Sequence, residues 1–134
     1  MDHDAELTAQ VNAIMPFGSL LGFELVTAST EEVRARIAWE ERLCTAGGIL
    51  HGGALMALAD AAGAYLAFLN LPEGANGTTT IESKTNFFRA VREGHVHARS
   101  RLLHRGRTTI VVETDLRDDA DKHVARFTQT QVVL

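Results

Sequence analysis

A histidine flanked by glycines, followed nine residues later by an isolated acid, is the feature of this sequence that most clearly indicates chemistry. Residues 50–53 spell Leu-His-Gly-Gly, and Asp60 then stands alone among alanines and leucines. A carboxylate is costly to bury without a partner, so an acid in such a run needs a reason to be there. Carboxylates act in proteins as general bases or nucleophiles. This segment is therefore the candidate reactive centre.

Other reactive motifs are missing from the sequence. It has no Gly-x-Ser-x-Gly elbow, no phosphate-binding Gly-x-x-x-x-Gly-Lys-Ser/Thr loop and no Gly-x-Gly-x-x-Gly. The six histidines lack Cys-x-x-Cys or His-Glu-x-x-His spacing, and we interpret His95 and His97 as solvent-facing side chains on one strand. Cys44 is interpreted as a small buried residue. The sequence predicts no metal site.

Length and composition indicate one ordinary globular domain over residues 1–134. The formal net charge is −4, and no basic stripe suited to nucleic acid is present. The acidic N-terminus lacks the pattern of a secretory signal, and no uninterrupted apolar run reaches the ~20 residues of a membrane span. A single cysteine suits a reducing compartment. We expect a cytoplasmic protein without nucleic-acid or membrane partners.

Hydrophobic spacing predicts two helices and six strands. Residues 4–15 carry apolar side chains on one helical face, and Pro16 and Gly18 end that segment. Residues 54–70 are apolar nearly all round, which is typical of a buried helix. Alternating or strand-forming runs lie at residues 21–29, 31–39, 78–88, 95–103, 107–116 and 122–134.

Short turns between consecutive strands favour an antiparallel sheet. One helix of ~17 residues is about 25 Å long, and only a curved sheet can cover most of it. The predicted fold class is α+β, with a curled antiparallel β-sheet wrapped around one long central helix. A helical segment within residues 1–15 precedes it.

Residues 50–65, which contain the Leu-His-Gly-Gly segment and Asp60, resemble the hot-dog-fold acyl-CoA thioesterases of the phenylacetate-degradation type, in which an acid stands nine residues after the histidine. Two further segments are similar to that family: residues 78–94, a strand ending in an aromatic-x-Arg turn before a glycine, and the Arg-Gly-Arg-Thr turn at residues 105–108. The resemblance runs from about residue 16 to the C-terminus. Two positions depart from it: Thr45 stands where the family often has asparagine or glutamine, and Ala90 replaces a proline.

The resemblance implies a hot-dog fold and hydrolysis of an acyl-CoA thioester. The Gly52 N–H would polarise the thioester carbonyl, with His51 shaping the loop and Gly53 letting the ligand approach the backbone. Asp60 would act as a general base on water or as a nucleophile, and the sequence leaves both open. Thr80 aligns with a family residue that positions the water or the acid, and an ordinary strand threonine is the alternative.

The remaining candidates would bind substrate. Thr45 keeps a hydrogen-bonding hydroxyl with a shorter reach than an amide. Phe87 and Phe88 point to opposite faces of a strand, so at most one of them, taken here as Phe88, lines an acyl pocket while the other packs in the core. Guanidinium groups suit the phosphates of coenzyme A, with solvated turn residues as the alternative; these candidates are Arg89, Arg105 and Arg107, with Gly106 between the last two.

Helix geometry predicts a site shared between two chains. Nine helical residues span ~13.5 Å and turn about two and a half revolutions, so Gly52 and Asp60 of one chain are expected to face different ways. A two-fold homodimer would bring Gly52 of one protomer to Asp60 of its partner, as the resembling family does. Mixed apolar outer strand faces further suggest a homotetramer. No cofactor is expected, because coenzyme A is part of the substrate.

Two other functions remain open from the sequence. A non-catalytic acyl-CoA binding module could use the same fold, and a hot-dog hydratase or dehydratase would present a histidine and an acid in a different arrangement. The intact acid at position 60 favours hydrolysis over binding alone. Aryl or short- to medium-chain acyl groups are expected only by analogy with the family.

Overall fold

The structure, a computed structural model, describes residues 2–134. In chain order its elements are α1 (Ala5–Ile14), α2 (Pro16–Leu21), β1 (Glu24–Ala28), β2 (Glu32–Ala38), two short 3-10 turns η1 (Glu41–Leu43) and η2 (Ala46–Gly48), α3 (Gly52–Leu69), β3 (Thr78–Phe87), β4 (His95–Arg105), β5 (Thr109–Asp118) and β6 (His123–Val133).

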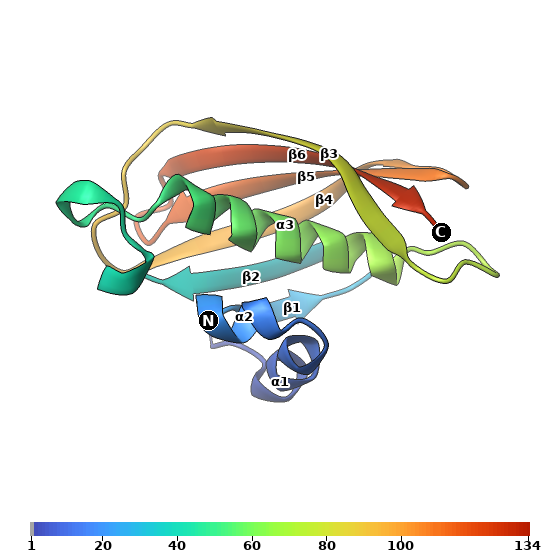
Figure 1. Cartoon of the computed structure of the whole chain (residues 1–134), viewed down its shortest axis with the longest axis horizontal. Coiled ribbons are helices and arrows are strands. Elements are labelled where there is room, and N and C mark those ends of the chain that lie inside the picture. The colour runs from blue at the N-terminus through green and yellow to red at the C-terminus, as the bar shows by residue number, and fades with distance from the viewer. Residues whose placement is uncertain (1) are drawn as a thin grey trace.

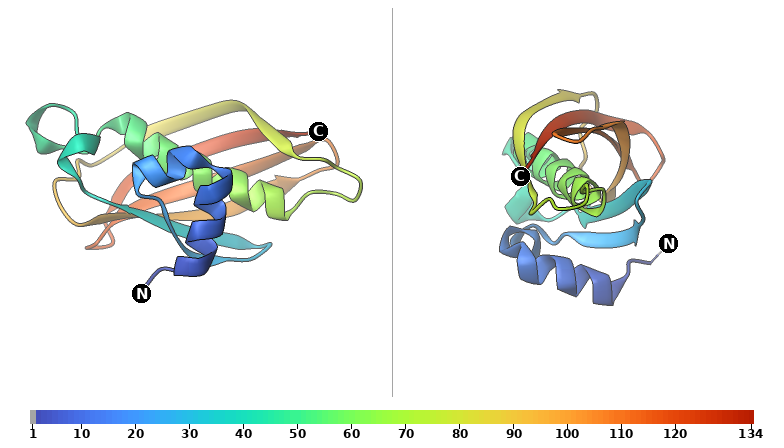
Figure 2. Two further views of the ribbon diagram at one scale, coloured as in Figure 1. Left: turned by 60° about the horizontal axis from the view of Figure 1, so that its bottom comes forward. Right: turned by 90° about the vertical axis from the view of Figure 1, so that its right-hand side faces the viewer.

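The strands form one antiparallel sheet in the order β1-β2-β4-β5-β6-β3. The chain runs along α3 after β2, and β3 then joins the far edge of the sheet beside β6. The sheet curls, and α3 lies along its concave side (Figures 1 and 2). The predicted α+β architecture, a curled antiparallel sheet around one long central helix, is confirmed.

Alternating side chains fill the space between the sheet and α3. β2 buries Val33, Ala35 and Ile37, the period-two pattern of a strand with one covered face. Leu58 and Leu66 of α3 are fully buried against this layer. α3 also has the length and the mean hydropathy of 1.5 that a membrane-crossing helix requires. Packing against the sheet accounts for the buried face of α3, whereas Met56 and Phe68 of the same helix are exposed.

The N-terminal segment folds as two helices rather than one. α1 ends at Ile14, and Pro16 opens α2 instead of only stopping the chain. Proline suits the first position of a helix because its fixed φ is already helical and its missing N–H would have no partner there. Gly22 ends α2 in the left-handed region at φ 75°. The following strand therefore starts at Glu24 and not at residue 21.

The two edges of the sheet differ in how they are covered. At the β1 edge, the Asp4 N–H donates to the Leu25 carbonyl at 2.8 Å, and the Leu25 N–H donates to Thr8 Oγ1 at 2.9 Å, so the N-terminal segment occupies this edge. At the other edge, β3 is exposed along almost its whole length. The sheet therefore has one capped edge and one open edge.

The outer face of the sheet carries several ion pairs. Arg34 and Arg99 both pair with Glu32, and Arg117 pairs with Asp115. Most apolar residues of β2 and β4 occupy the inward register, which leaves mainly arginine and histidine on the outward one, while Leu103 of β4 is exposed. The predicted tetramer stays a prediction, and charged pairs make up much of the surface it would use.

Candidate active site

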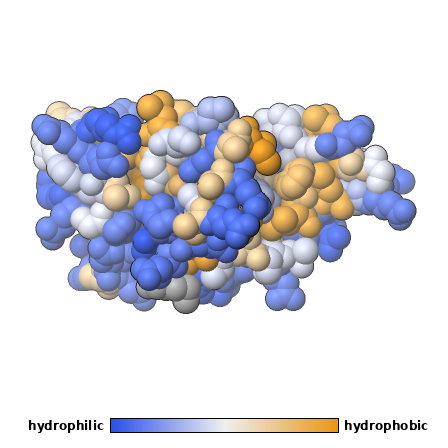
Figure 3. All heavy atoms as spheres, turned by 90° about the horizontal axis from the view of Figure 1, so that it is seen from below, coloured by the Kyte–Doolittle hydropathy of each residue, from blue (hydrophilic) through white to orange (hydrophobic). Residues whose placement is uncertain are grey.

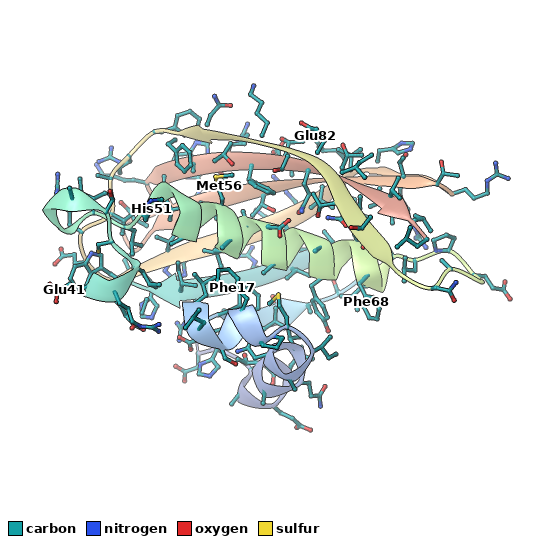
Figure 4. The ribbon with its side chains drawn as sticks, in the orientation of Figure 1. Phe17, Glu41, His51, Met56, Phe68 and Glu82 are labelled. Carbon is teal, nitrogen blue, oxygen red and sulfur yellow. The ribbon has the colours of Figure 1, made fainter. Side chains whose placement is uncertain are left out.

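His51 ends the loop before α3 and caps the helix (Figure 4). Its ring Nδ1 accepts a hydrogen bond from the Gly53 N–H at 2.8 Å. The backbone N–H of His51 donates to the Leu43 carbonyl at 2.9 Å. A side chain at this N-cap position satisfies one of the N–H groups that a first helical turn leaves unpaired. Because Nδ1 accepts here, the neutral ring carries its proton on Nε2. This arrangement favours the supporting role expected for His51.

The two glycines of the motif have different surroundings. The Gly53 N–H is taken by His51, and a Cβ on Gly53 would lie 2.9 Å from His51 Nδ1, so the space at Gly53 is needed for the cap. The Gly52 N–H has no acceptor among residues 2–134. It lies at the positive end of the α3 dipole, where a carbonyl or an anion is stabilised. Within residues 2–134, the Gly52 N–H is therefore a donor without a partner at the start of α3.

Asp60 meets a chain of neutral side chains from β3 and β6. Gln129 Nε2 donates to Asp60 Oδ1 at 2.9 Å, and Thr80 Oγ1 donates to the same oxygen at 3.3 Å. Gln131 Nε2 donates to Thr80 Oγ1 at 2.5 Å, which leaves the threonine proton for Asp60. Within residues 2–134 no group donates to Asp60 Oδ2. The carboxylate is held through one oxygen and open through the other.

Desolvation raises the pKa of Asp60 above its ordinary value, and the hydrogen bonds from Thr80 and Gln129 partly oppose this rise because they stabilise the ionised form. A raised pKa makes the carboxylate a better proton acceptor. Although its neighbours in sequence are alanines and leucines, the side chain bonds polar groups of β3 and β6. It is exposed in the single chain and turned toward the sheet.

Gly52, Met56 and Asp60 lie on one side of α3, so the expectation that Gly52 and Asp60 face different ways is wrong. A Cβ on Gly52 would lie 3.2 Å from the Phe87 ring of β3, and Asp60 bonds Thr80 of the same strand. Eight residues turn about 800°, which leaves only ~80° between the two positions. Their separation along the axis, about 12 Å, still keeps one chain from placing both on one carbonyl. Figure 4 shows Met56 on the β3 side of α3.

The two phenylalanines at the end of β3 also differ from the prediction. Phe87 lies against Gly52, whereas the Phe88 ring packs on His123 with centroids 4.9 Å apart. The two are 49% and 57% exposed, so neither packs in the core. Both stay accessible because β3 is an edge strand with its outer edge open. Phe87, and not Phe88, is the aromatic that packs against Gly52.

The candidate arginines lie at opposite ends of the folded molecule. Arg89 follows β3 at the end of the molecule where α3 begins (Figure 1). The β4–β5 hairpin lies at the other end, where α3 finishes, and carries Arg105, Gly106 and Arg107. All of these arginines are exposed. A single chain therefore does not bring the hairpin to Gly52.

Thr45 belongs to a tied loop before α3. Its N–H donates to the Ile49 carbonyl at 2.8 Å, and Trp39 Nε1 donates to the Gly48 carbonyl at 2.9 Å. Gly47 and Gly48 have φ of 81° and 72°, a conformation that favours glycine. The Thr45 side chain is exposed on this loop, next to the strand-like pairing of Cys44 with Leu50.

Within residues 2–134, no three His, Cys, Asp or Glu side chains are grouped so that they could hold a metal ion. His97 bonds Asp119 at 2.6 Å and remains partly exposed. The groups that bond Asp60 are one neutral amide, Gln129, and one hydroxyl, Thr80, both of which donate to its carboxylate.

Sequence reasoning missed three residues of the Asp60 cluster: Gly63, Gln129 and Gln131. The two glutamines are 0% and 1% exposed and occupy inward positions of β6, on the same side as Phe127. The signal was available in the Thr-Gln-Thr-Gln run at residues 128–131, where polar residues take both faces of a strand. Two amides on a face that should be apolar indicate a polar partner across the core.

Comparison with known proteins agrees with this geometry. The family model of the thioesterase superfamily matches residues 47–125. A curated relative from Pseudomonas aeruginosa, provisionally named an esterase, is 33% identical over 128 residues, which are 94% of this chain and 86% of the relative. A crystal structure of a mutant thioesterase from Pseudomonas aeruginosa is 30% identical, with a TM-score of 0.88 over 95% of this chain and 93% of that one. A thioesterase from Haemophilus influenzae is 28% identical, with a TM-score of 0.87 over 95% and 90% of the two chains. The protein therefore belongs to the thioesterase superfamily and has its hot-dog fold.

Proposed function

We propose that the protein is an acyl-CoA thioesterase that releases coenzyme A and a free acid from aryl or short- to medium-chain thioesters. The observation that carries this proposal is Asp60, which is fixed through Oδ1 by Thr80 and Gln129 while Oδ2 stays open. The unpaired Gly52 N–H supplies the second element that thioester hydrolysis needs, a donor for the carbonyl oxygen.

Two routes use the same groups. As general base, Asp60 Oδ2 takes a proton from water while the water oxygen attacks the carbonyl carbon; the C–S bond then breaks and the thiolate of coenzyme A gains a proton. As nucleophile, Oδ2 attacks the carbonyl carbon itself, coenzyme A leaves, and water opens the mixed anhydride. The Gly52 N–H stabilises the negative charge on the oxygen in both.

A single turnover in ¹⁸O-water detects the nucleophilic route in which water attacks the aspartyl carbon of the anhydride. If Asp60 is a general base, the first acid released contains ¹⁸O from the attacking water. If Asp60 is a nucleophile and water attacks the aspartyl carbon of the anhydride, the first acid carries an unlabelled oxygen and the label appears in Asp60. Mass spectrometry of the product and of the peptide containing Asp60 reads both outcomes.

The site is proposed to form between two copies of the chain. β3 leaves its outer edge open, and three large apolar side chains of α3 and β3 are exposed: Met56, Ile81 and Phe87. An open strand edge is a template for pairing with another strand. Pairing β3 with β3 about a two-fold axis extends the sheet and covers these side chains.

This antiparallel arrangement reunites the separated candidates. It sets the end of one chain that carries the β4–β5 hairpin beside the end of its partner where α3 begins. The hairpin arginines are then available for the phosphates of a substrate whose carbonyl lies at the Gly52 N–H of the other chain. Asp60 lies about 12 Å along α3 from the Gly52 of its own chain. In the dimer it can instead reach a carbonyl that is bound at the Gly52 N–H of the other chain.

We further propose that these dimers pair into tetramers through the charged outer sheet face, in the cytoplasm and without nucleic-acid or membrane partners. Ion pairs between exposed charges weaken with salt. Light scattering should therefore show a tetramer at low ionic strength that reverts to a dimer in high salt.

A panel of acyl-CoA esters tests the activity. Phenylacetyl-, hydroxybenzoyl- and C4 to C12 acyl-CoA are incubated with purified protein, and free thiol is followed with a chromogenic reagent. Turnover that disappears in Asp60→Asn supports the thioesterase. Tight binding of the esters with no turnover on any member would instead make the protein an acyl-CoA binding module.

A further inference from the structure

Gly63 and Gln129 approach each other more closely than any side chain on α3 would permit. A Cβ built on Gly63 would lie 1.7 Å from Gln129 Oε1 and 2.9 Å from its Cδ. Such distances do not occur between real atoms, so position 63 must be glycine for Gln129 to keep its place. A glycine inside a helix costs stability relative to alanine. We therefore expect the close approach of Gln129 to provide something that offsets the stability lost through a glycine at position 63.

The orientation of the Gln129 amide shows what the close approach provides. Its Nε2 donates to Asp60 Oδ1 at 2.9 Å, and an ionised carboxylate can only accept, which fixes which end of the amide faces Asp60. Its Oε1 is buried with no donor among residues 2–134. Leaving a buried carbonyl oxygen unpaired is unfavourable. The amide is thus placed for Asp60 and not for its own hydrogen-bonding needs.

We propose that Gln129 is a positioning residue that holds Asp60 Oδ1, so that Oδ2 is directed at the substrate, and that Gly63 is the space that admits it. This inference rests on the proposed thioesterase function. Thr80, held by Gln131, makes the second and longer bond to the same oxygen. The pair of donors fixes the plane of the carboxylate, which one donor alone leaves free to rotate.

The electrostatic surroundings of Asp60 make this role measurable. Tyr65 is the only other titratable residue of α3. On β3 and β6, the pair Ser83 and Gln129 alternates along the strands with pairs that carry charged residues. These charged residues are Glu82, Lys84 and Arg126. Among them, Glu82 accepts a hydrogen bond from Thr130 (Figure 4). No charge of a neighbouring side chain is among the causes that shift the pKa of Asp60. A change at Gln129 therefore acts on Asp60 through the lost hydrogen bond.

Two variants remove the bond by different means. Gln129→Met keeps the length of the side chain and deletes the donor. Gly63→Ala leaves Gln129 intact and displaces its amide, while alanine favours the helix. Thr130→Val is the matched control, because Thr130 is the neighbour of Gln129 on β6 and its hydroxyl bonds Glu82 instead of Asp60.

The readout is the titration of Asp60 by ¹³C-carboxyl NMR, with its resonance assigned from its loss in Asp60→Asn. Removing a hydrogen bond to the ionised form should raise the midpoint by roughly one pH unit in Gln129→Met, and in the same direction in Gly63→Ala. The acidic limb of kcat/KM should move to higher pH by the same amount. Thr130→Val should change neither.

An Asp60 midpoint that stays at its wild-type value in Gln129→Met, or an equal shift in Thr130→Val, overturns the proposal. If Gln129→Met does not fold, Gly63→Ala decides by the same criterion. The titration needs no turnover. A wild-type protein without thioesterase activity would therefore remove the proposed function, while the NMR midpoints would still establish or refute the hold of Gln129 on Asp60.

Discussion

The two oxygens of Asp60 have different surroundings, and this asymmetry determines what the residue can do. Oδ1 accepts from Gln129 and Thr80, while no described residue donates to Oδ2. A structural carboxylate would be expected to satisfy both oxygens, since an ionised acid is acceptor-only with room for about four bonds. An acid fixed on one side and free on the other is suited to take a proton or to attack.

Asp60→Asn should abolish hydrolysis while the fold persists. The amide keeps the shape of the carboxyl group but is neither a base nor a nucleophile, so kcat should fall at least ~100-fold. Calorimetry with a non-hydrolysable thioether analogue should show nearly unchanged affinity. Thr80→Val is the graded comparison and should cost less, because Gln129 still holds the acid. Most of the wild-type activity surviving in Asp60→Asn would exclude Asp60 from the mechanism.

The same substitution should stabilise the protein at neutral pH. Because the folded-state pKa of Asp60 lies above the ordinary value of 3.8, the folded chain binds this proton more tightly than the unfolded chain. Stability then falls as pH rises through the window between 3.8 and the raised folded value. An asparagine side chain cannot titrate, so the Tm advantage of Asp60→Asn should appear above that window and shrink below it. Thermal unfolding of both proteins from pH 3 to pH 8 measures it. An advantage that does not vary with pH would argue against a raised pKa.

At the scale of elements, α3 depends on the cap at its start. His51→Ala removes the acceptor for the Gly53 N–H and should lower stability by about 1 kcal/mol. His51→Asn replaces it with one of the best capping side chains and should restore both Tm and most of the activity. If Asn restores Tm but not kcat, the imidazole has a chemical role beyond the cap.

The secondary elements were predictable because each depends on a local period. Alternation in β2 and the all-round apolar character of α3 are direct consequences of which faces are covered. α2 was not predicted because a proline can either follow the end of one helix or occupy the first position of the next, and Pro16 was interpreted only in the first way. The pairing of β3 with β6 instead of a sequence neighbour depends on long-range contacts, which no local pattern records.

The candidate site was predictable to the same extent. Asp60, Gly52 and Thr80 followed from a motif and its resemblance, and the structure brings Thr80 to Asp60. Gln129 is 69 residues from Asp60 in the chain, and only the completed sheet makes them neighbours. The contact of Phe87 with Gly52 was equally hidden, because the choice between two adjacent phenylalanines depends on the register of an edge strand.

At the scale of the whole molecule, the open β3 edge predicts a specific interface. Ile81→Glu places a charge beside this edge and should raise the dimer dissociation constant at least about tenfold, with activity lost in parallel. Leu103→Glu is the control, since Leu103 on β4 is 57% exposed and Ile81 is 59% exposed. Light scattering over a dilution series measures both. Equal effects of the two variants would place the interface elsewhere.

Mixing two inactive chains tests whether each site is shared. Asp60→Asn and Gly52→Val are co-expressed with different tags, and the heterodimer is purified. If a site uses Gly52 of one protomer and Asp60 of the other, one site collects both lesions and the second is intact, so roughly half the wild-type rate returns. If each chain holds a complete site, no intact site exists and verified heterodimers stay inactive.

The surface that carries α1 and α2 has both hydrophilic and apolar patches (Figure 3). The segment that contains α1 also limits how chains can assemble. Asp4 and Thr8 occupy the β1 edge through their bonds to Leu25. Another chain can therefore add a strand only at the β3 edge. If two chains pair at β3 as proposed, the pair exposes only its two covered β1 edges, so growth through strand edges stops at two chains and cannot continue into a fibre. Deleting residues 2–15 would uncover the β1 edge. Such a chain should form ribbons that lengthen with concentration and bind amyloid dyes, whereas the full chain should reach a fixed size.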